Sequence, residues 1–200
     1  MSEMFSRNVP DSFNILKEVT VGIAGCGGIG SNVATSLTRS GVGSLIIADM
    51  DLVEITNLNR QHYFQDDIGK TKVDALSTHL HNINPDLKII THFGKVTRRN
   101  YLDLFKNVDI LIEAFDLAEE KKWLIEGWMK NNPTLPIIGG SGLSGTGKTE
   151  LLKVQRSGQL TLCGDQESDM SEGLIAPRVI MVANMMAYET IFQILKDRKS

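Results

Sequence analysis

The stretch Gly25-Cys-Gly-Gly-Ile-Gly30 follows a short apolar run, residues 19–24, and precedes residues 31–40, whose apolar side chains recur at helical spacing. Three of its glycines match the pattern G-x-G-x-x-G: Gly25, Gly27 and Gly30. Between a strand and a helix, this pattern forms a tight turn whose backbone N–H groups face phosphates. The neighbouring Gly28 lets the backbone approach a ligand closely. The stretch predicts a nucleotide-binding turn; the alternative is a glycine-rich connector that binds nothing.

Short apolar segments alternate with amphipathic segments along the rest of the chain. The predicted strands are residues 19–24, 45–48, 88–91, 108–112 and 136–138. The predicted helices are residues 31–40, 72–83, 101–105 and 118–130. This alternation predicts an α/β fold of the Rossmann-like kind, in which helices cover both faces of a mostly parallel sheet.

The C-terminal part of the chain departs from this alternation. Residues 150–155 and 159–162 flank a turn-like Arg-Ser-Gly and predict an antiparallel hairpin. Residues 176–195 predict a final helix, with Pro177 near the first turn, where a missing N–H costs little. We therefore expect the parallel sheet to end in an antiparallel hairpin and one helix.

The composition indicates one folded unit whose partners are small molecules or proteins. The chain has 200 residues, of which 42% are hydrophobic, so we predict a single domain over residues 1–200 with an N-terminal leader segment at 1–18. The formal net charge is -3, and no dense basic run indicates nucleic acid or membrane binding. The leader segment lacks the apolar core of a signal peptide, and no apolar run reaches membrane-spanning length, so we expect a cytoplasmic protein.

A carboxylate and a polar loop follow the second predicted strand. Asp49 ends that strand, at the position where a carboxylate accepts hydrogen bonds from ribose hydroxyls. Residues 54–67 then form a long polar excursion with three side chains that can reach a nucleotide: Asn57, Arg60 and Gln61. Lys72 opens the next helix. The two cations can stabilise charge on a phosphate under attack, and the alternative is that both are solvated surface charges.

Asp116 lies just past the apolar run of the fourth predicted strand. A carboxylate at this carboxyl end can hold Mg²⁺ against nucleotide phosphates. The alternative is a cap for the helix that begins at Ala118, which is compatible with a metal role. Together with the two cations, Asp116 favours attack on a nucleotide phosphate over hydride transfer.

A second glycine-rich segment, Gly142-Leu-Ser-Gly-Thr-Gly-Lys-Thr149, matches the Walker A pattern G-x-x-x-x-G-K-T. That motif requires a long helix beginning at its Lys-Thr pair and further strands that supply a magnesium-binding acid. The residues that follow read better as one arm of the hairpin. We therefore interpret residues 139–147 as a flexible loop beside the site, and a P-loop ATPase is the less favoured alternative.

Several short motifs recur in a fixed order along nearly the whole chain. In chain order they are the glycine turn, Gly41-Val-Gly, Asp49-Met-Asp, Asn57-Leu-Asn-Arg-Gln, Gly69-Lys-Thr-Lys, Ile83-Asn-Pro and Asp109-Ile-Leu-Ile-Glu-Ala-Phe-Asp. This order resembles the ThiF, MoeB and HesA family, which shares its adenylation domain with ubiquitin-activating enzymes. Residues 162–168 and 176–179 resemble in particular the short ThiF proteins of thiamine biosynthesis.

The resemblance implies a reaction and its participants. In that family, an enzyme binds ATP and Mg²⁺, and the C-terminal glycine carboxylate of a small ubiquitin-like sulfur carrier attacks the α-phosphate to give an acyl-adenylate and pyrophosphate. The expected partner is a ThiS-like carrier. The resemblance implies that the nucleotide is bound by three groups of residues. The phosphates would be bound by Gly25, Gly27, Gly28 and Gly30, the ribose by Asp49, and the triphosphate by Asn57, Arg60, Gln61 and Lys72. The implied catalytic residues are Arg60, Lys72 and Asp116, and Asp116 is also the implied metal ligand.

The chain departs from the family pattern in three places. The family's aspartate-asparagine pair reads Asp116-Leu117 here, the zinc-binding C-x-x-C pairs are missing, and the crossover segment 168–173 has no cysteine. We therefore expect no zinc and no covalent step on this chain. The resemblance implies a homodimer in which one subunit lends an arginine to the other, and Arg7 is the one candidate before the glycine turn.

Three other functions remain open from the sequence. A MoeB-like enzyme would activate the carrier of molybdopterin synthase by the same chemistry. A nicotinamide-dependent oxidoreductase is compatible with the glycine turn and Asp49, although the chain lacks a separate substrate domain. A non-catalytic scaffold that binds the carrier is compatible with the missing cysteine and with Leu117.

Overall fold

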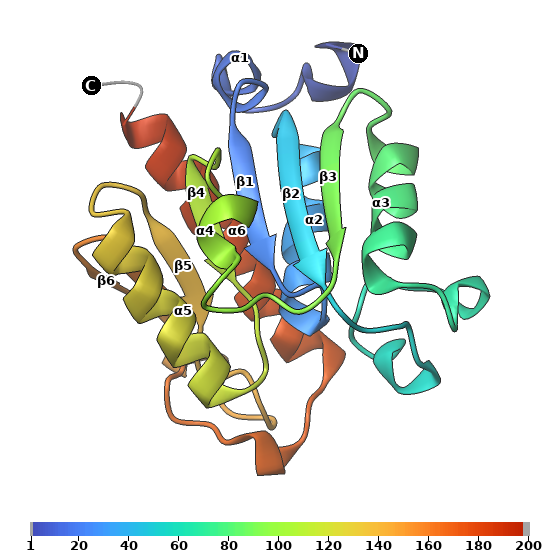
Figure 1. Ribbon diagram of the computed structural model, residues 1–200, viewed down its shortest axis with the longest axis vertical. Helices are drawn as coiled ribbons and strands as arrows, with labels where there is room; N and C mark the ends of the chain where they lie inside the picture. Colours follow the sequence, from blue (N-terminus) through green and yellow to red (C-terminus); the bar gives the residue numbers. More distant parts are fainter. Residues whose placement is uncertain (1, 198–200) are drawn as a thin grey trace.

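The computed structural model describes residues 2–197, so residues 1 and 198–200 of the predicted domain lie outside it. One seven-stranded sheet runs through the described chain in the order β3-β2-β1-β4-β5-β7-β6 (Figure 1). Its strands are β1 (Thr20–Ala24), β2 (Ser44–Asp49), β3 (Lys88–Phe93), β4 (Ile110–Glu113), β5 (Ile137–Gly140), β6 (Lys153–Ser157) and β7 (Leu160–Gly164). Every pairing is parallel except that of β6 with β7. The predicted fold class and the predicted hairpin are confirmed.

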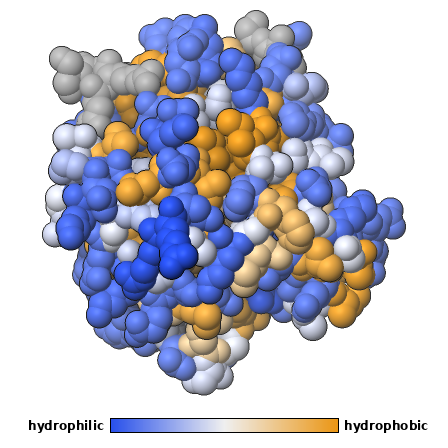
Figure 2. All heavy atoms as spheres, in the orientation of Figure 1, coloured by the Kyte–Doolittle hydropathy of each residue, from blue (hydrophilic) through white to orange (hydrophobic). Residues whose placement is uncertain are grey.

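Helices cover both faces of the sheet (Figure 1). They are α1 (Ser12–Leu16), α2 (Gly28–Ser40), α3 (Lys72–Ile83), α4 (Tyr101–Leu104), α5 (Ala118–Asn131) and α6 (Ala176–Asp197). One core packs α2, α3 and α6 against one face, and a second core packs α4 and α5 against the other. This second layer leaves part of the sheet open: apolar side chains reach the surface over β2 and β3 (Figure 2), and Ile90 is 62% exposed.

The inner parallel strands β1, β2, β4 and β5 are buried on both faces, and their sequences are accordingly mostly apolar. In β1, for example, Val21 and Ile23 pair with Leu45 and Ile47 of β2, and all four side chains are fully buried. Parallel pairing also brings the carboxyl ends of β1, β2, β4 and β5 to one edge of the sheet. Segments that are distant in sequence therefore meet at that edge, where ligands bind in folds of this kind.

Most predicted elements lie within three residues of the observed ones, and the starts of β6 and α2 each differ by three residues. The shift that concerns the site is that of α2. Its N-terminus is Gly28, three residues before the predicted start. Glycine is a poor helix former, so the pattern of apolar residues misses this first turn. Local propensity is overridden here because the glycines are needed for close contact with β1, as the site shows.

The N-terminal segment is folded onto the domain over the residues that the structure describes. The 3-10 helix Ser2–Phe5 leads to α1, the ring of Phe5 stacks on Phe13 with centroids 4.6 Å apart, and Leu16 is in the core. Within residues 2–197, no helix is both long and apolar enough to cross a membrane.

The Walker A-like segment is not a P-loop. The 3-10 helix Thr149–Leu151 follows its last glycine, and strand β6 begins two residues later. A P-loop needs a long helix at this point, because the helix N-terminus supplies the phosphate-binding amides. The segment is therefore a loop between β5 and the hairpin, as we interpreted it, and the ATPase alternative is ruled out.

Candidate active site

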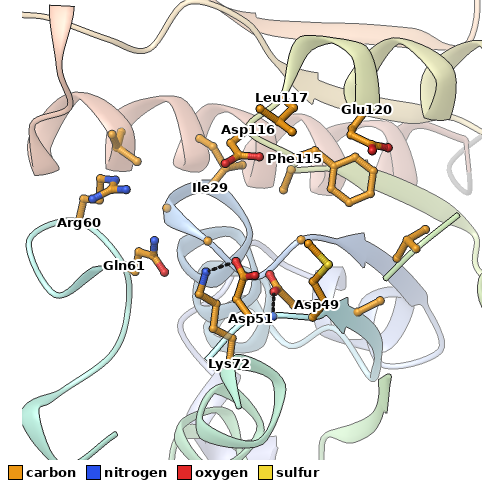
Figure 3. A pocket seen from close by; sticks show the side chains of 18 of the residues that line it. Ile29, Asp49, Asp51, Arg60, Gln61, Lys72, Phe115, Asp116, Leu117 and Glu120 are labelled. Carbon is orange, nitrogen blue, oxygen red and sulfur yellow. Dashed lines mark hydrogen bonds and ion pairs between the residues drawn. The ribbon is translucent and has the colours of Figure 1, made fainter. Parts of the chain in front are cut away.

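A cavity of about 250 Å³ lies at the carboxyl edge of the sheet, between the glycine turn and the loops after β4, β5 and β7. Figure 3 shows Asp49, Asp51 and Lys72 on one side of it and Asp116 and Leu117 on the other. Predicted site residues that line it are Gly25, Gly27, Gly28, Asp49, Arg60, Gln61, Lys72 and Asp116. The structure thus brings together side chains that are spread over ninety positions of the sequence.

The glycine turn is shaped by close approach of its own backbone. Gly25 has φ of 100°, a conformation that side-chain-bearing residues rarely adopt. A Cβ on Gly30 would lie 1.8 Å from the carbonyl oxygen of Gly25, so only glycine fits there. Gly27 is the N-cap of α2 and Gly28 is its first residue; both line the cavity, where their N–H groups are available to a phosphate. Gly30 does not line the cavity, and its role in the structure is to pack the helix against the turn.

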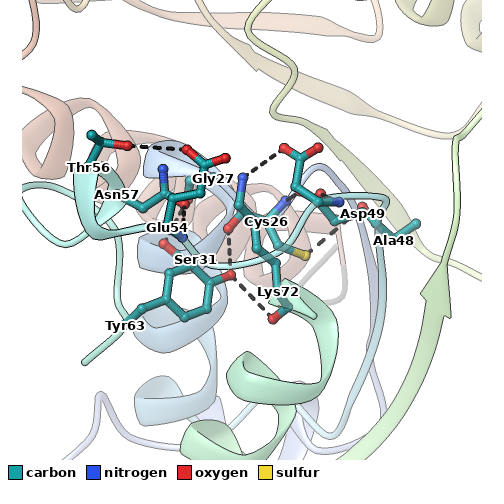
Figure 4. Close-up of polar contacts among 11 residues, drawn as sticks. Cys26, Gly27, Ser31, Ala48, Asp49, Glu54, Thr56, Asn57, Tyr63 and Lys72 are labelled. Carbon is teal, nitrogen blue, oxygen red and sulfur yellow. Dashed lines mark hydrogen bonds and ion pairs between the residues drawn. The ribbon is translucent and has the colours of Figure 1, made fainter. Parts of the chain in front are cut away.

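Asp49 is fixed in place by the glycine turn (Figure 4). Its Oδ2 accepts a 2.6 Å hydrogen bond from Cys26 N, and its Oδ1 accepts one of 2.8 Å from Asp51 N. Burial raises the pKa of Asp49, although the two backbone N–H groups and nearby Lys72 act against the shift. Each oxygen keeps a lone pair for a further donor, so the carboxylate can still accept hydrogen bonds from ribose hydroxyls. Cys26 itself is fully buried, as expected for a packing residue.

Lys72 enters the cavity from the first turn of α3. Only 6% of the residue is exposed, and its Nζ lies 2.8 Å from Asp51 Oδ2. A buried ammonium group requires such a partner, and Asp51 supplies the opposite charge beside Lys72 at the cavity. Asp51 was not among the predicted site residues. Its position two residues after Asp49, in the alternating pattern Asp-Met-Asp, was the available signal.

Arg60 lies at the cavity wall, within the polar loop that precedes α3 (Figure 3). Its Nη1 donates to Thr56 O at 3.1 Å and to Asn59 Oδ1 at 2.7 Å, and both acceptors belong to the same loop. Gln61 also lines the cavity, and its Oε1 is buried without a hydrogen-bond partner among the described residues. The structure therefore leaves guanidinium donors of Arg60 at the cavity wall, where a ligand would meet them.

Asn57 is placed differently from its neighbours. It is buried at the end of the 3-10 helix Ile55–Asn57, and its Oδ1 accepts a 3.0 Å hydrogen bond from Glu54 N. It is not part of the cavity wall. In this structure Asn57 shapes the loop that carries Arg60, and its predicted contact with a triphosphate stays a prediction.

Asp116 is exposed at the cavity, beyond the end of β4. The N-cap of α5 is Leu117, and within residues 2–197 the Asp116 side chain makes no hydrogen bond or ion pair. The helix-cap alternative is therefore not observed, and the carboxylate is available to a ligand.

Glu113, three residues earlier, fixes the segment that carries Asp116. It is fully buried at the end of β4, where its Oε1 accepts from Phe115 N at 2.7 Å and its Oε2 accepts from Lys121 Nζ at 2.6 Å. Burial raises the pKa of Glu113, and the adjacent Lys121 acts against that shift. The sequence pattern missed this residue because it lies in the run Ile-Leu-Ile-Glu, which reads as a buried strand.

The donor set at the cavity fits a phosphate-bound Mg²⁺ and does not form an all-protein metal cage. Over residues 2–197 there is no cluster of three or more His, Cys, Asp or Glu side chains that could hold a metal ion. Mg²⁺ at a nucleotide takes one or two carboxylates, and phosphate oxygens and water supply the other ligands. The free carboxylate of Asp116 meets that requirement.

The side of the cavity next to α6 is apolar. It is formed by four side chains, which we call the outer wall: Leu143, Met170, Leu174 and Val179. They come from the loop after β5, the segment after β7 and the first turn of α6. The outer wall approaches the glycine turn, because a Cβ on Gly28 would lie 3.0 Å from Val179 Cγ1. Sequence reasoning missed these residues, since nothing local distinguishes them from core residues.

A sheet wound in this way, with polar groups gathered at its carboxyl edge, defines a nucleotide-binding protein of the α/β class. Within that class, the model of the ThiF family matches residues 4–200, and the chain belongs to the ThiF family. Ubiquitin-like modifier-activating enzymes are among the relatives that the chain resembles. The predicted family is confirmed, and the oxidoreductase alternative is not supported.

Two relatives illustrate the range of the family. Over 161 residues the chain is 34% identical to tRNA threonylcarbamoyladenosine dehydratase of Bacillus subtilis (strain 168), a match that covers 78% of this chain and 62% of that protein. Over 107 residues it is 40% identical to ubiquitin-like modifier-activating enzyme 5 of Drosophila persimilis, covering 54% of this chain and 28% of that protein. The chain thus spans less than two thirds of either relative. Neither is named for thiamine biosynthesis, so that part of the predicted resemblance stays a prediction.

Solved structures agree with the fold. The E. coli tRNA N6-threonylcarbamoyladenosine dehydratase TcdA in complex with ATP superposes with a TM-score of 0.87 at 19% identity, covering 99% of this chain and 94% of that chain. At that identity the likeness shows the fold alone. E. coli MccB with AMPCPP and MccA has a TM-score of 0.73 at 25% identity, covering 92% of this chain and 58% of that chain.

Proposed function

We propose that this enzyme uses ATP to activate the C-terminal glycine carboxylate of a ThiS-like sulfur carrier, forming the carrier acyl-adenylate and pyrophosphate for thiazole and thiamine biosynthesis. The observation that supports the proposal most is the convergence of Lys72 and Arg60 with the glycine turn at one cavity. This arrangement offers a phosphate cradle and two cations, and no nucleophile or general base is needed. A carboxylate substrate supplies its own nucleophile, because it is already ionised at neutral pH.

The chemistry is a displacement at the α-phosphorus. A carboxylate oxygen forms a bond to that phosphorus, the bond to the bridging oxygen of the β-phosphate breaks, and pyrophosphate leaves with the electron pair. Negative charge builds on the phosphate oxygens during this step, and Lys72 and Arg60 stabilise it together with the N–H groups of Gly27 and Gly28. Asp49 orients the nucleotide through the ribose. Alignment and charge stabilisation thus carry the catalysis.

Asp116 completes the proposal as the Mg²⁺ ligand. Mg²⁺ supplies charge neutralisation at the triphosphate when it is bound. The contribution of this chain is a carboxylate that no other side chain in the described part neutralises, and the hydrogen bond that Phe115 N donates to Glu113 holds its segment in position. The family's asparagine is Leu117 here and 62% exposed, so any part that asparagine plays is absent from this position.

A tRNA substrate is the second candidate, because the Bacillus subtilis relative is named for one. Binding of tRNA relies on neutralising phosphates with basic side chains. The formal net charge of -3 and the sequence pI near 5.8 do not provide that surface on this chain. A small protein carrier, with a molybdopterin-type carrier as the variant of the same chemistry, therefore fits better.

We include a homodimer in the proposal on the basis of the family resemblance alone. Arg7 is exposed in the N-terminal segment and could serve a second subunit only if that segment lies at an interface. Light scattering of the purified protein gives its mass in solution. A monomer that is fully active would remove Arg7 from the mechanism.

ATP–pyrophosphate exchange separates these candidates. The enzyme is assayed with ATP, Mg²⁺ and, in separate reactions, a ThiS-like carrier, a molybdopterin-type carrier or tRNA that bears threonylcarbamoyladenosine. We expect exchange only with the ThiS-like carrier, and a carrier truncated by its terminal glycine is the matched control. Exchange with tRNA alone would contradict the proposal, and carrier binding without any exchange would instead indicate a non-catalytic scaffold.

A further inference from the structure

Two loops that are far apart in sequence are joined behind the outer wall. The first follows β5, at residues 141–149, and the second follows β7, at residues 165–175. Their backbones are hydrogen-bonded at several points: Asp165 N to Gly142 O, Gln166 N to Ser141 O and Gly145 N to Gly173 O. Ser144 N also donates to Ser168 Oγ at 3.1 Å. The loops therefore form one continuous layer at the apolar end of the cavity.

A buried ion pair between Asp165 and Arg178 locks this layer to α6, and we call the pair the loop clamp. Only 3% of Arg178 is exposed; its Nη2 pairs with Asp165 Oδ2, and its Nη1 donates to Gly147 O at 2.7 Å. The other oxygen of Asp165 accepts from Glu167 N and Ser168 N, both at 2.8 Å. One arginine and one aspartate thus hold both loops and the first turn of α6 in a single arrangement.

The backbone beside the loop clamp is tightly packed, and one of its residues has an unfavourable conformation. A Cβ on Gly142 would lie 1.9 Å from Asp165 Oδ1, and Gln166 is a non-glycine residue with φ of 65°. The Nε of Arg178 is buried with no partner among the described residues. Buried ion pairs with an unsatisfied donor contribute little net stability, and their best-attested use is to fix one arrangement among several. Arg178 is therefore placed to fix the geometry of the loops.

The position of the clamp connects it to substrate binding. Val179 is the residue after Arg178, and it lies against Gly28 at the phosphate-binding turn. Leu143 and Leu174 of the outer wall belong to the two clamped loops. Asp49 and the strand ends close the opposite end of the cavity. The C-terminal segment of a protein substrate would therefore pass along the outer wall to bring its carboxylate to a phosphate at the glycine turn.

We propose that Arg178 and Asp165 are positioning residues for the protein substrate: they hold the outer wall in the shape that receives an extended C-terminal segment, and they have no part in binding ATP. This inference rests on the proposed function. It predicts that loosening the clamp weakens binding of the carrier and leaves nucleotide binding intact, because the nucleotide contacts lie on the other elements.

The test is steady-state ATP–pyrophosphate exchange with the full-length enzyme, with KM measured separately for the carrier and for ATP. We expect Arg178→Lys and Asp165→Asn to raise the carrier KM by about 10-fold or more, with kcat and the KM for ATP within about 2-fold of wild type. The matched controls are Arg156→Lys and Glu189→Gln. They alter the other arginine–carboxylate pair between the hairpin and α6, where Arg156 Nη2 lies 2.7 Å from Glu189 Oε1, away from the cavity.

Each outcome decides the inference. A rise in both KM values together, or the same rise in the controls, would show that the clamp acts only through general stability and would overturn the proposal. If the clamp variants do not fold, Ser168→Ala decides, since it keeps the ion pair and removes the hydrogen bonds of the Ser168 hydroxyl with Ser144 N and with the Asp165 carboxylate. We expect a smaller rise in the carrier KM alone, and no rise overturns the proposal. A wild-type enzyme without carrier-dependent exchange would overturn the proposed function and this inference with it, whereas an active wild type with unaffected clamp variants would overturn only the inference.

Discussion

Lys72 and Asp51 form an ion pair of 2.8 Å at the floor of the cavity, and the lysine is buried while the aspartate is half exposed. The aspartate compensates the ammonium charge when the site is open. A triphosphate would bring several negative charges to the same ammonium group, so Lys72 can exchange the Asp51 carboxylate for a phosphate. The ion pair thus holds the ammonium group of Lys72 at the place where a phosphate would bind.

Replacing Lys72 tests that role. We expect Lys72→Met to lower kcat of ATP–pyrophosphate exchange by about 100-fold or more, since it removes charge stabilisation in the transition state. Lys70→Met is the control, because Lys70 is exposed, pairs with Asp67 and does not line the cavity. Equal losses in both variants would show that the effect is on the fold of the loop.

Arg60 provides a second test, because an arginine and a lysine differ in geometry more than in charge. We expect Arg60→Lys to lower kcat by about 10-fold and Arg60→Ala by about 100-fold, since only a guanidinium offers paired donors to a phosphate. Single-turnover rates of pyrophosphate release give these values. Full activity of Arg60→Ala would mean that the observed bonds to Thr56 and Asn59 are the whole role of this residue.

The Glu113–Lys121 pair predicts a coupled effect on stability. Lys121→Met leaves a buried carboxylate without its partner and should lower the free energy of unfolding by about 3–5 kcal/mol, and the double variant with Glu113→Gln should recover part of that loss. Urea denaturation measures both. Lys122→Met, which changes an exposed lysine on the same helix, should stay near wild type; additive losses in the double variant would contradict the pairing.

Asp165 predicts a pH dependence. Burial acts to raise the pKa of Asp165, but hydrogen bonds from Ser168 N, Glu167 N and Arg178 outweigh it and lower the pKa to about 2. Because the folded-state pKa lies below the unfolded value of 3.8, the stabilisation is complete above about pH 4 and is lost as the pH falls toward about 2.

We therefore expect wild type to lose stability over that interval and Asp165→Asn to lose less of it, although the variant is less stable at neutral pH. Urea unfolding at a series of pH values measures the slope. Asp66→Asn removes an exposed carboxyl away from the clamp and serves as the comparison. Identical slopes for wild type and Asp165→Asn would contradict a depressed pKa at this site.

Two glycine-to-alanine variants should lower stability for different reasons: Gly30 has no space for a Cβ, and Gly69 has a strained backbone conformation. Gly30→Ala should lower stability by about 3 kcal/mol or more, because its Cβ would collide with the backbone oxygen of Gly25. Gly69→Ala should cost about 1 kcal/mol, because Gly69 has φ of 87° but no atom within 4 Å of the added Cβ. Thermal unfolding of both variants checks the order, and a tolerated Gly30→Ala would contradict the close packing of α2.

The part of the site that is built from one stretch of chain could be predicted from the sequence. The glycine turn, Asp49, Arg60 and Lys72 lie within residues 25–72, where strand ends and helix starts can be read from local patterns. Parallel strand order then places these ends at one edge. Asn57 shows the limit of this reasoning, since a polar residue in a ligand-facing loop can be used to shape the loop instead.

The rest of the site depends on contacts that no local pattern encodes. Leu143, Met170 and Val179 meet only because the loops after β5 and β7 cross and dock on α6. Glu113 stands in an apolar strand, and its partner Lys121 is the fourth residue of the next helix, so neither residue identifies the other. Buried charged pairs and loop crossings are set by tertiary packing, and for that reason they appear only in the folded structure.

Attack of a carboxylate on the α-phosphate is the central claim, and isotope transfer tests it most directly. The carrier is prepared with ¹⁸O in its C-terminal carboxylate and treated with enzyme, ATP, Mg²⁺ and hydroxylamine, which cleaves an acyl-adenylate at the carbonyl carbon. Mass spectrometry of the released nucleotide should show AMP that contains one ¹⁸O atom, together with pyrophosphate. Unlabelled AMP, or release of ADP and phosphate, would contradict the account.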